Sequence, residues 1–270
     1  MSDFIKIHKK NYKINGINDP NNSNEENIKL LNENLISKLK IIKSSTLYKE
    51  IFITLKEIKF IKIRCLALGS PSQDQPSLYQ LALLILLVEE FNLHSENISL
   101  YDPIFNELDL KLLTINYRYR VEKNYDQIFD QDEILYFLPH APLNLTNEII
   151  DLESPKLLLA NNIITHTDRL TNLELFEKYP TISKIINYIN NLDQSDKLTS
   201  GNLDGFQKVI NNNSKRKLQR KNKYNANNVK TIDYSQIVTY FEKVELKSFK
   251  HLEEGPWLNS FSDIAFHRLI

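Results

Sequence analysis

Residues 61–103 read IKIRCLALGSPSQDQPSLYQLALLILLVEEFNLHSENISLYDP. The pattern predicts a buried strand over 61–68, a turn at Gly69 and Ser70, a helix over 79–93 that is apolar on nearly every side, and a second strand over 98–102. A strand, a helix and a second strand of these lengths form a β-α-β unit. The unit has a glycine at its first turn and an acid, Asp102, at the tip of its second strand. It indicates a fold and a location for a site, and it names no reaction.

Strand and helix patterns continue to alternate after this unit. Further strands are expected over 116–122, 134–138 and 156–160, and further helices over 104–113, 144–152, 173–179 and 182–191. Such alternation is typical of an α/β fold. We therefore expect a Rossmann-like, doubly wound, mostly parallel sheet of five or more strands. The expected strand order is 3-2-1-4-5, with the reversal beside the first strand.

The sequence divides into an N-terminal extension, residues 1–58, and an α/β domain, residues 59–270. The first 26 residues are polar. From Asn27 onward, apolar residues three and four apart predict an amphipathic helix, and a weaker helical segment covers 47–57. The apolar stripe could bind a partner protein, but packing against the α/β domain is the simpler interpretation.

Residues 192–230 interrupt the pattern with many Asn, few apolar residues and the basic run 215–223. This composition predicts a solvated or disordered basic insertion, although such a run also resembles a nuclear-localisation or nucleic-acid patch. Beyond it, residues 232–241 are ambiguous between helix and strand, and 244–249 could add a strand. The tail, 257–267, is apolar enough to need packing on the domain.

Charge and cysteine content narrow the classes of partner and site. Lys and Arg number 34 and equal Asp and Glu, so no global field favours nucleic acid or an anionic membrane. The single cysteine, Cys65, excludes an internal disulfide and a multi-cysteine zinc site, and its strand position predicts an inert core thiol. No metal site is expected. With no secretory signal and no apolar run long enough to span a bilayer, we expect a cytoplasmic protein, with the nucleus as a second location.

The carboxyl ends of the predicted parallel strands define a candidate ligand site at the switch point of the sheet. The residues collected there are Gly69, Ser70, Tyr101, Asp102, Pro139, His140, Asn161 and Asn162. A glycine lets the backbone approach a ligand, and a helix N-terminus offers free N–H groups. Each residue also has a purely structural interpretation: a tight turn for Gly69, a helix cap for Asp102 and a hydrogen-bonded imidazole for His140. Since no catalytic motif occurs, catalytic residues stay unknown.

The motifs, in their order, resemble the sensitivity-to-red-light-reduced (SRR) domain family. They are Leu68-Gly-Ser70 followed by Tyr79-Gln-Leu-Ala-Leu-Leu84, then Tyr101-Asp-Pro-Ile-Phe105, Tyr136-Phe-Leu-Pro-His-Ala-Pro142 and Phe261-Ser-Asp-Ile-Ala-Phe-His267. The last is similar to the family's terminal F-N-D-x-S-x-H pattern, which adds Asp263 and His267 to the candidate site. The similarity covers about 60–162 and 243–270, and the composition resembles a fungal member of the benomyl-resistance type.

The resemblance implies a regulatory protein more than a proven catalyst. Plant members are linked to phytochrome signalling and the circadian clock, animal members to haem synthesis and clock-gene expression, and fungal members to microtubule stability. Where the family commonly has His-Cys-Pro, this chain has His140-Ala141-Pro142, which makes haem binding through a cysteine doubtful. Ser262 and Ala265 likewise replace the usual Asn and Ser of the tail.

Three hypotheses fit these observations. In the first, a regulatory protein binds a small molecule or a partner segment at the switch point: Gly69 and Ser70 shape the cradle, Asp102 accepts hydrogen bonds, and His140 with Asp263 or His267 closes the polar wall. In the second, the protein is a transferase with a nucleoside cofactor such as S-adenosylmethionine, against which the single glycine argues. In the third, it is an interaction module that uses its helical N-terminus and basic loop. The ligand, any cofactor and any protein partner stay unidentified.

Overall fold

A computed structural model of the chain describes residues 24–125, 133–199, 232–257 and 259–270. Contacts divide the chain into two compact units, Met1–Asp168 with Phe241–Ile270, and Arg169–Tyr240. The polar residues 1–23 and the basic run 215–223 lie outside the described residues. No helix in the described ranges has the length and apolar character needed to cross a membrane.

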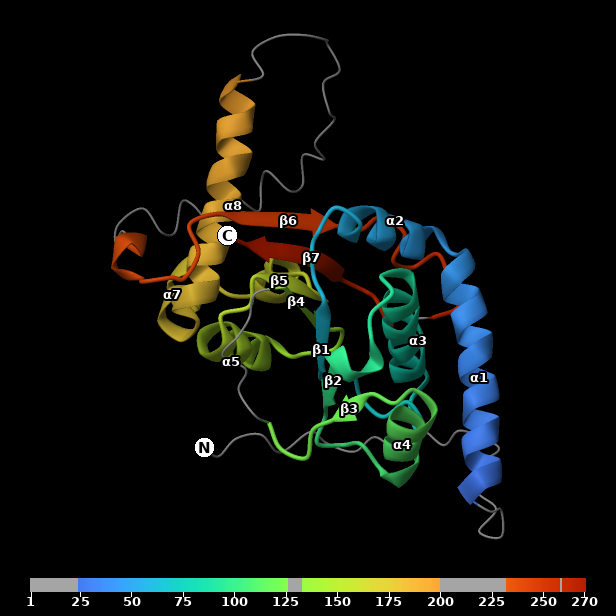
Figure 1. Cartoon of the computed structure of the whole chain (residues 1–270). Coiled ribbons are helices and arrows are strands. Elements are labelled where there is room, and N and C mark those ends of the chain that lie inside the picture. Colours follow the sequence, from blue (N-terminus) through green and yellow to red (C-terminus); the bar gives the residue numbers. More distant parts are fainter. Residues whose placement is uncertain (1–23, 126–132, 200–231, 258) are drawn as a thin grey trace. The chain divides into compact units, whose positions relative to one another are not determined.

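One sheet of seven described strands lies in the first unit, in the order β3-β2-β1-β4-β5-β7-β6 (Figure 1). The strands are β1 (Lys62–Leu66), β2 (Ile98–Tyr101), β3 (Arg120–Val121), β4 (Ile134–Leu138), β5 (Leu157–Asn161), β6 (Val244–Ser248) and β7 (Ile264–Leu269). The first five pair in parallel, whereas β7 is antiparallel to both β5 and β6. The predicted α/β class and the strand order 3-2-1-4-5 are confirmed. The tail contributes a strand, β7, where only packing was expected.

The third strand is shorter than its alternating sequence predicts. Only Arg120 and Val121 pair with β2. The preceding residues 112–116 form a π-helical turn. The chain then reverses at Arg118, which has a φ of 57°, and the Tyr119 N–H donates to the Leu113 carbonyl. Part of the segment that the alternating apolar pattern assigned to a strand therefore belongs to the end of the helix and the turn after it.

The helices of the first unit cover both faces of its sheet. They are α1 (Asn24–Ser44), α2 (Thr46–Leu55), α3 (Gln75–Glu90), α4 (Glu107–Lys111), α5 (Leu143–Glu153) and α6 (Ile163–Thr167). In Figure 1, α3 and α1 lie on one side of the sheet and α5 lies on the other. Asp74 caps α3 by accepting from the Ser77 N–H, and Pro76 lies in its first turn. Leu31 and Leu35 of α1 are buried in the same core as α3, in agreement with the predicted packing of this helix.

The second unit contains α7 (Asn172–Lys178) and α8 (Pro180–Thr199). The helix α8 continues to Thr199, into the segment predicted to be loop, and residues 200–231 lie outside the described residues. The ambiguous segment 232–241 contains only a short 3₁₀ turn, Tyr234–Gln236. Its carboxylate Asp233 caps this turn by accepting from the Ser235 N–H.

The two faces of the sheet differ in chemistry because successive side chains of a strand point to opposite sides. Cross-strand register places Cys65, Phe137, Leu159 and Phe266 in one row. These four belong to the apolar core that also contains the buried leucines of α3. The neighbouring row, on the opposite face, is Arg64, Tyr136, Leu158 and His267. The buried side chains of one face are thus apolar, whereas the other face contains buried polar groups.

Candidate functional site

The turn after β1 requires a glycine. Gly69 has a φ of 82°, in the left-handed region, and Ala67 two residues earlier has a φ of 57°. A Cβ added at Gly69 would overlap the Ser77 hydroxyl at the start of α3. The Gly69 N–H donates to Asp102 Oδ2 at 2.8 Å. The turn therefore brings backbone against both the helix and the tip of β2, which agrees with the structural interpretation of Gly69 as a tight turn.

The Asp102 carboxylate lies half-buried at the carboxyl end of β2. Its Oδ1 accepts from the Ile104 N–H at 3.0 Å, and its Oδ2 accepts from Gly69. Burial raises the pKa of Asp102 above its usual value, and these two N–H groups and the nearby His140 oppose that rise. Each oxygen has one hydrogen bond among the described residues, and a carboxylate oxygen can accept a second. The side chain is thus fixed in place with acceptor capacity left over.

Ser70 takes part in a buried network that ties the β1–α3 turn to α4. The buried Asp109 carboxylate accepts from the Ser70 hydroxyl at 2.5 Å and from the Ser72 N–H at 2.8 Å. Asn106, which caps α4, donates its side-chain N–H₂ to the hydroxyls of Ser70 and Ser72 at 3.2 and 2.8 Å. The donors of Ser70 and Asn106 are therefore used within the protein, and the network holds the turn rigid.

The tips of β4 and β5 lie on the same edge of the sheet as Asp102. Pro139 is buried, whereas His140 is exposed and close enough to Asp102 to affect the pKa of its carboxyl group. Asn161 donates its side-chain N–H to the Ala141 carbonyl at 3.2 Å, which links the two tips. Tyr101 stacks at a tilt on Tyr125, with 6.0 Å between ring centroids. The structure thus brings Gly69, Asp102 and His140 together at one edge.

Asp263 pairs with a histidine that the sequence pattern does not single out. His166 Nε2 lies 2.8 Å from Asp263 Oδ2, and the two side chains are 26% and 18% exposed. His166 lies on the short helix α6 that follows β5, and Asp263 immediately precedes β7. Asn162 connects them, because its N–H donates to the Asp263 carbonyl and its side chain caps α6. No residue spacing could predict a pair that forms across β5 and β7.

His267, which the family resemblance added to the site, is fully buried in β7. Its Nε2 accepts from the Ile163 N–H at 3.3 Å. Burial lowers its pKa to about 4, against the opposing effects of the Leu158 backbone and the Asp263 charge. The imidazole is 0% exposed, so it has no surface with which to contact a ligand at this edge.

The polar face of the sheet contains a buried ionic network centred on Arg64. Its guanidinium contacts both oxygens of Glu122 at 2.8 and 2.9 Å and lies 3.1 Å from Glu153 Oε2. Tyr136 donates its hydroxyl to the same Glu153 oxygen at 2.7 Å, and Tyr125 donates to Oε1. The side chains of Arg64 and Glu153 are 1% and 0% exposed. Arg64 precedes the continuously apolar residues 65–68 of the predicted strand, and its position there was the sequence signal for this network.

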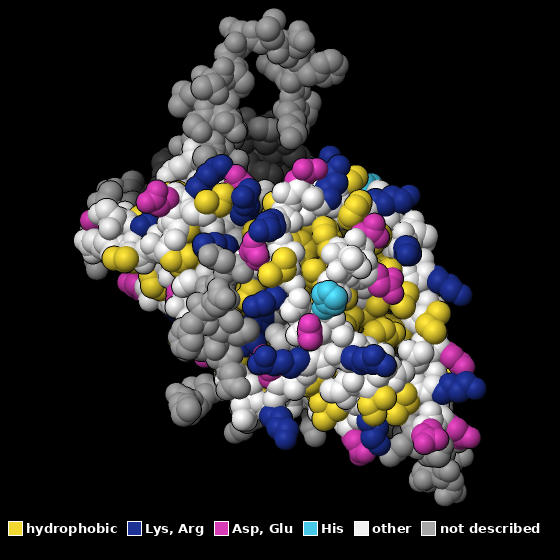
Figure 2. Space-filling model, viewed as in Figure 1, with side chains coloured by type: hydrophobic (Ala, Val, Ile, Leu, Met, Phe, Trp, Pro, Cys, Tyr) yellow, Lys and Arg dark blue, Asp and Glu magenta, His cyan; other side chains and the backbone are white. Residues whose placement is uncertain are grey.

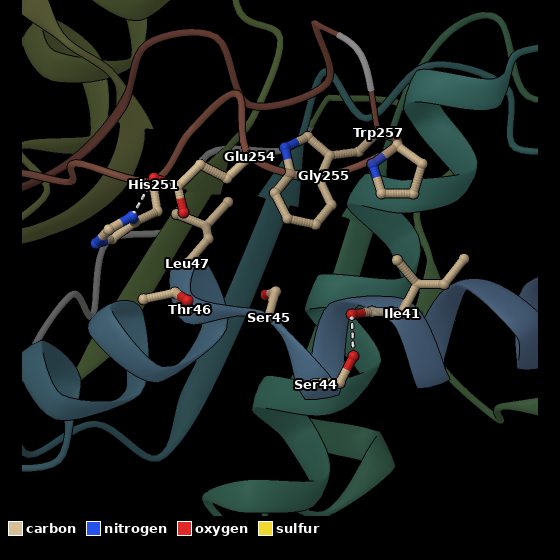
Figure 3. Close-up of a pocket in the computed structure, with 10 residues that line it drawn as sticks. Ile41, Ser44, Ser45, Thr46, Leu47, His251, Glu254, Gly255 and Trp257 are labelled. Atoms are coloured by element: carbon tan, nitrogen blue, oxygen red, sulfur yellow. Dashed lines mark hydrogen bonds and ion pairs between the residues drawn. The ribbon is translucent and has the colours of Figure 1, made fainter.

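A cavity of about 230 Å³ lies where α1 meets α2 (Figure 3). Its lining residues are Ile41, Ser44, Ser45, Thr46, Leu47, His251, Glu254, Gly255, Pro256 and Trp257. None of them was predicted for the site. The Ser45 hydroxyl is used in capping α2, and His251 Nδ1 lies 2.6 Å from Glu254 Oε1. A Cβ at Gly255 would overlap the Trp257 ring, so only a glycine at this position lets the tryptophan line the cavity as it does.

Positive and negative side chains are interspersed on the face of the protein shown in Figure 2.

Within the described residues, no group of three or more His, Cys, Asp or Glu side chains could hold a metal ion. Cys65 is fully buried, and burial raises the pKa of its thiol, which disfavours the reactive thiolate.

The comparisons with known proteins agree with the resemblance found in the motifs. The chain is 25% identical over 134 residues to a mouse (Mus musculus) "SRR1-like protein". The aligned region covers 46% of this chain and 53% of the mouse protein. It thus spans about half the length of this curated relative. No solved structure matches the chain. The family model of the SRR1 domain matches residues 31–268, from within α1 to β7. The chain therefore belongs to the SRR1 domain family.

Proposed function

We propose that this protein is a regulatory protein that binds a small hydroxyl-bearing ligand, of the size of a nucleoside, at the carboxyl edge of β2, β1 and β4. The observation that carries the proposal is the Asp102 carboxylate. It is held by two backbone N–H groups and retains acceptor capacity on both oxygens. A pair of ribose hydroxyls could donate to those two oxygens. An acid at this position performs that role in dinucleotide-binding sheets.

Burial supports the proposal on energetic grounds. A half-buried carboxylate loses hydration, which raises its pKa, and hydrogen-bond donors from a ligand would restore part of the lost stabilisation. The Asp109 network and the required glycine hold the surrounding turn in one conformation, so that little ordering would be needed on binding.

The test is the affinity for adenosine, measured by calorimetry and by thermal shift. Asp102→Asn should weaken binding by roughly 10- to 100-fold, because hydrogen bonds to a charged group contribute about 1.5–3 kcal/mol. Asp151→Asn, at an exposed acid on α5, is the matched control and should bind as the wild type does. Binding should also weaken as the pH falls through the raised pKa of Asp102, since the protonated acid accepts fewer hydrogen bonds. Equal affinities for Asp102→Asn and the wild type would contradict the proposal.

The regulatory part of the proposal rests on family membership. The cytoplasm, with the nucleus as a second location, is proposed from the lack of a secretory signal in the sequence. Of the processes linked to the family, microtubule stability is the one that the fungal-type resemblance favours. In cells that lack this protein, the wild type should restore tolerance of a microtubule-depolymerising benzimidazole, and Asp102→Asn should not. Full restoration by Asp102→Asn would separate the cellular role from the ligand site.

A further inference from the structure

The strand β6 forms one edge of the sheet, and among the described residues no strand pairs with its outer side (Figure 1). Its five residues, Val244–Ser248, all have a partner residue in β7. The strand at the opposite edge, β3, pairs over only two residues. An edge strand presents unpaired N–H and C=O groups that can bind a further strand, and a longer strand presents more of them. Of the two edges, β6 therefore offers the better surface for the addition of a strand.

The hydrogen bonds between β6 and β7 determine which main-chain groups of β6 point outward. Just before the strand, the Lys243 and Ile270 main chains exchange N–H···O bonds of 2.7 and 2.9 Å. In an antiparallel pair, residues that exchange such bonds alternate with residues whose N–H and C=O groups point away from the partner strand. The outward residues of β6 are therefore Val244, Leu246 and Ser248. Among the described residues, none forms a hydrogen bond with their outward main-chain groups.

The charges of β6 select one register for antiparallel pairing with a second copy of the strand. The alternation of outward groups allows a two-fold axis at Glu245, Leu246 or Lys247. An axis at Glu245 would place its carboxylate opposite its own copy, and an axis at Lys247 would do the same with two ammonium groups. An axis at Leu246 places Glu245 of each copy opposite Lys247 of the other. Opposite charges across a strand pair are favourable and like charges are unfavourable. The strand is thus self-complementary about Leu246.

The same register uses the outward main-chain groups. It pairs Val244 with Ser248 of the second copy and Leu246 with its own counterpart, and these are the residues whose N–H and C=O groups point outward. The half-buried Leu246 side chains would contact each other across the axis, on the face opposite to the charged side chains. One register therefore satisfies the main chain, the apolar side chain and the charges together.

The single chain leaves one of these charges without a partner. Glu245 contacts Lys243 and lies 3.5 Å from Arg268. Lys247, in contrast, is exposed and forms no ion pair with any described residue. A carboxylate from a second copy would therefore supply Lys247 with the partner that its own chain does not.

We propose that this protein forms a symmetric dimer in which β6 pairs antiparallel with β6 of a second copy, with the two-fold axis at Leu246. The two sheets then continue into one another. Because the strand is short and its charge pairs are exposed, the dimer is reversible and weakens as salt rises. The inference is independent of the proposed function, since β1, β4, β5 and β7 separate β6 from the strand that carries Asp102.

The experiment is sedimentation of the full chain over a range of protein concentrations, at low and high salt. The wild type should show a dimer that grows with concentration. Glu245→Lys and Lys247→Glu should each weaken association by roughly 10- to 100-fold, because each replaces two opposite-charge pairs with two like-charge pairs. An equimolar mixture of the two variants should recover the dimer, because opposite charges then face each other again. Lys49→Glu, at an exposed lysine of α2, is the matched control and should dimerise as the wild type does.

A main-chain variant tests the strand pairing itself. Leu246→Pro removes an N–H that points away from β7, so the fold should be kept while the dimer is lost. Thermal unfolding of each variant shows whether it is folded, and the mixture of the two charge variants remains decisive if Leu246→Pro is not. A wild type that stays monomeric at about 0.5 mM would overturn the proposal. So would a dimer that survives in folded Leu246→Pro, or charge variants that associate no better mixed than alone.

Discussion

The two faces of the one sheet are built by opposite means. On the α3 face, Cys65, Phe137 and Leu159 pack with buried leucines in a continuous apolar core. On the α5 face, the adjacent residues Arg64 and Tyr136 join Glu153 in a buried ionic network. Apolar packing tolerates small changes of shape, whereas a buried charge is stable only while every partner is present. The comparison indicates that the α3 face stabilises the fold through apolar burial, whereas the α5 face fixes the relative positions of β1, β4 and α5 through its ionic network.

The largest effect is expected from breaking the ionic network. Arg64→Met should lower the free energy of unfolding by about 4 kcal/mol, because it leaves the buried Glu122 and Glu153 without their cation. The measurement is the shift of the urea unfolding midpoint. Arg120→Met is the matched control: Arg120 lies 3.5 Å from the same Glu122, but its side chain is 66% exposed, so its loss should cost less than about 1 kcal/mol. Similar costs for the two variants would show that burial does not set the strength of the network.

A cavity on the apolar face should cost somewhat less. Leu84→Ala, at a fully buried position of α3, should lower the free energy of unfolding by about 3 kcal/mol, from lost burial and the cavity left behind. The cost should be the same at pH 5 and pH 7, since no titrating group is involved. Leu152→Ala, at an exposed leucine of α5, serves as the control and should change stability little. A strongly pH-dependent loss of stability in Leu84→Ala would contradict the inference that apolar packing alone stabilises the α3 face.

The smallest effect is expected from the pH dependence of His267. Its pKa is about 4 in the folded protein and 6.5 in the unfolded chain, so the unfolded chain binds the proton first as pH falls. The stability that depends on neutral His267 is therefore fully present above pH 6.5 and lost as pH falls toward 4. Between pH 7 and pH 5 the loss should be about 2 kcal/mol.

The matched comparison for this prediction is between His267→Gln and His94→Gln. Urea unfolding midpoints at pH 7, 6 and 5 should fall less steeply for His267→Gln than for the wild type, whereas His94→Gln should follow the wild type. If the unfolding midpoints of all three proteins fell equally with pH, His267 would not be the group that makes the stability of the wild type depend on pH.

Local periodicity was enough to predict the parallel part of the sheet. The apolar runs of β1, β4 and β5 and the acid and glycine of the first β-α-β unit gave the strand order and the edge on which Gly69, Asp102 and His140 meet. These features depend on neighbours in sequence and on the right-handed crossover rule. The strand β7 could not be derived in this way, because it pairs with β5 across more than a hundred residues.

The polar partners escaped prediction for the same physical reason. Arg64 and Glu153 are 89 residues apart, and His166 and Asp263 lie on elements that only the folded sheet brings together. The pattern identified Asp263 through the family motif, but it contained no signal for His166. The hydrogen bond from the Ser70 hydroxyl to Asp109 was also not predicted, since it joins two residues 39 positions apart.

The position of β7 between β5 and β6 has a consequence for how the family can vary in length. The chain leaves the sheet at Asn161 and returns at Val244, and the hydrogen bonds of β7 close that excursion from both sides. The entropy of closing a flexible loop rises by only about 0.6 kcal/mol for each doubling of its length. Insertions into flexible parts of this excursion, outside α6, α7 and α8, would therefore cost little free energy and would leave the edge that carries Asp102 the same.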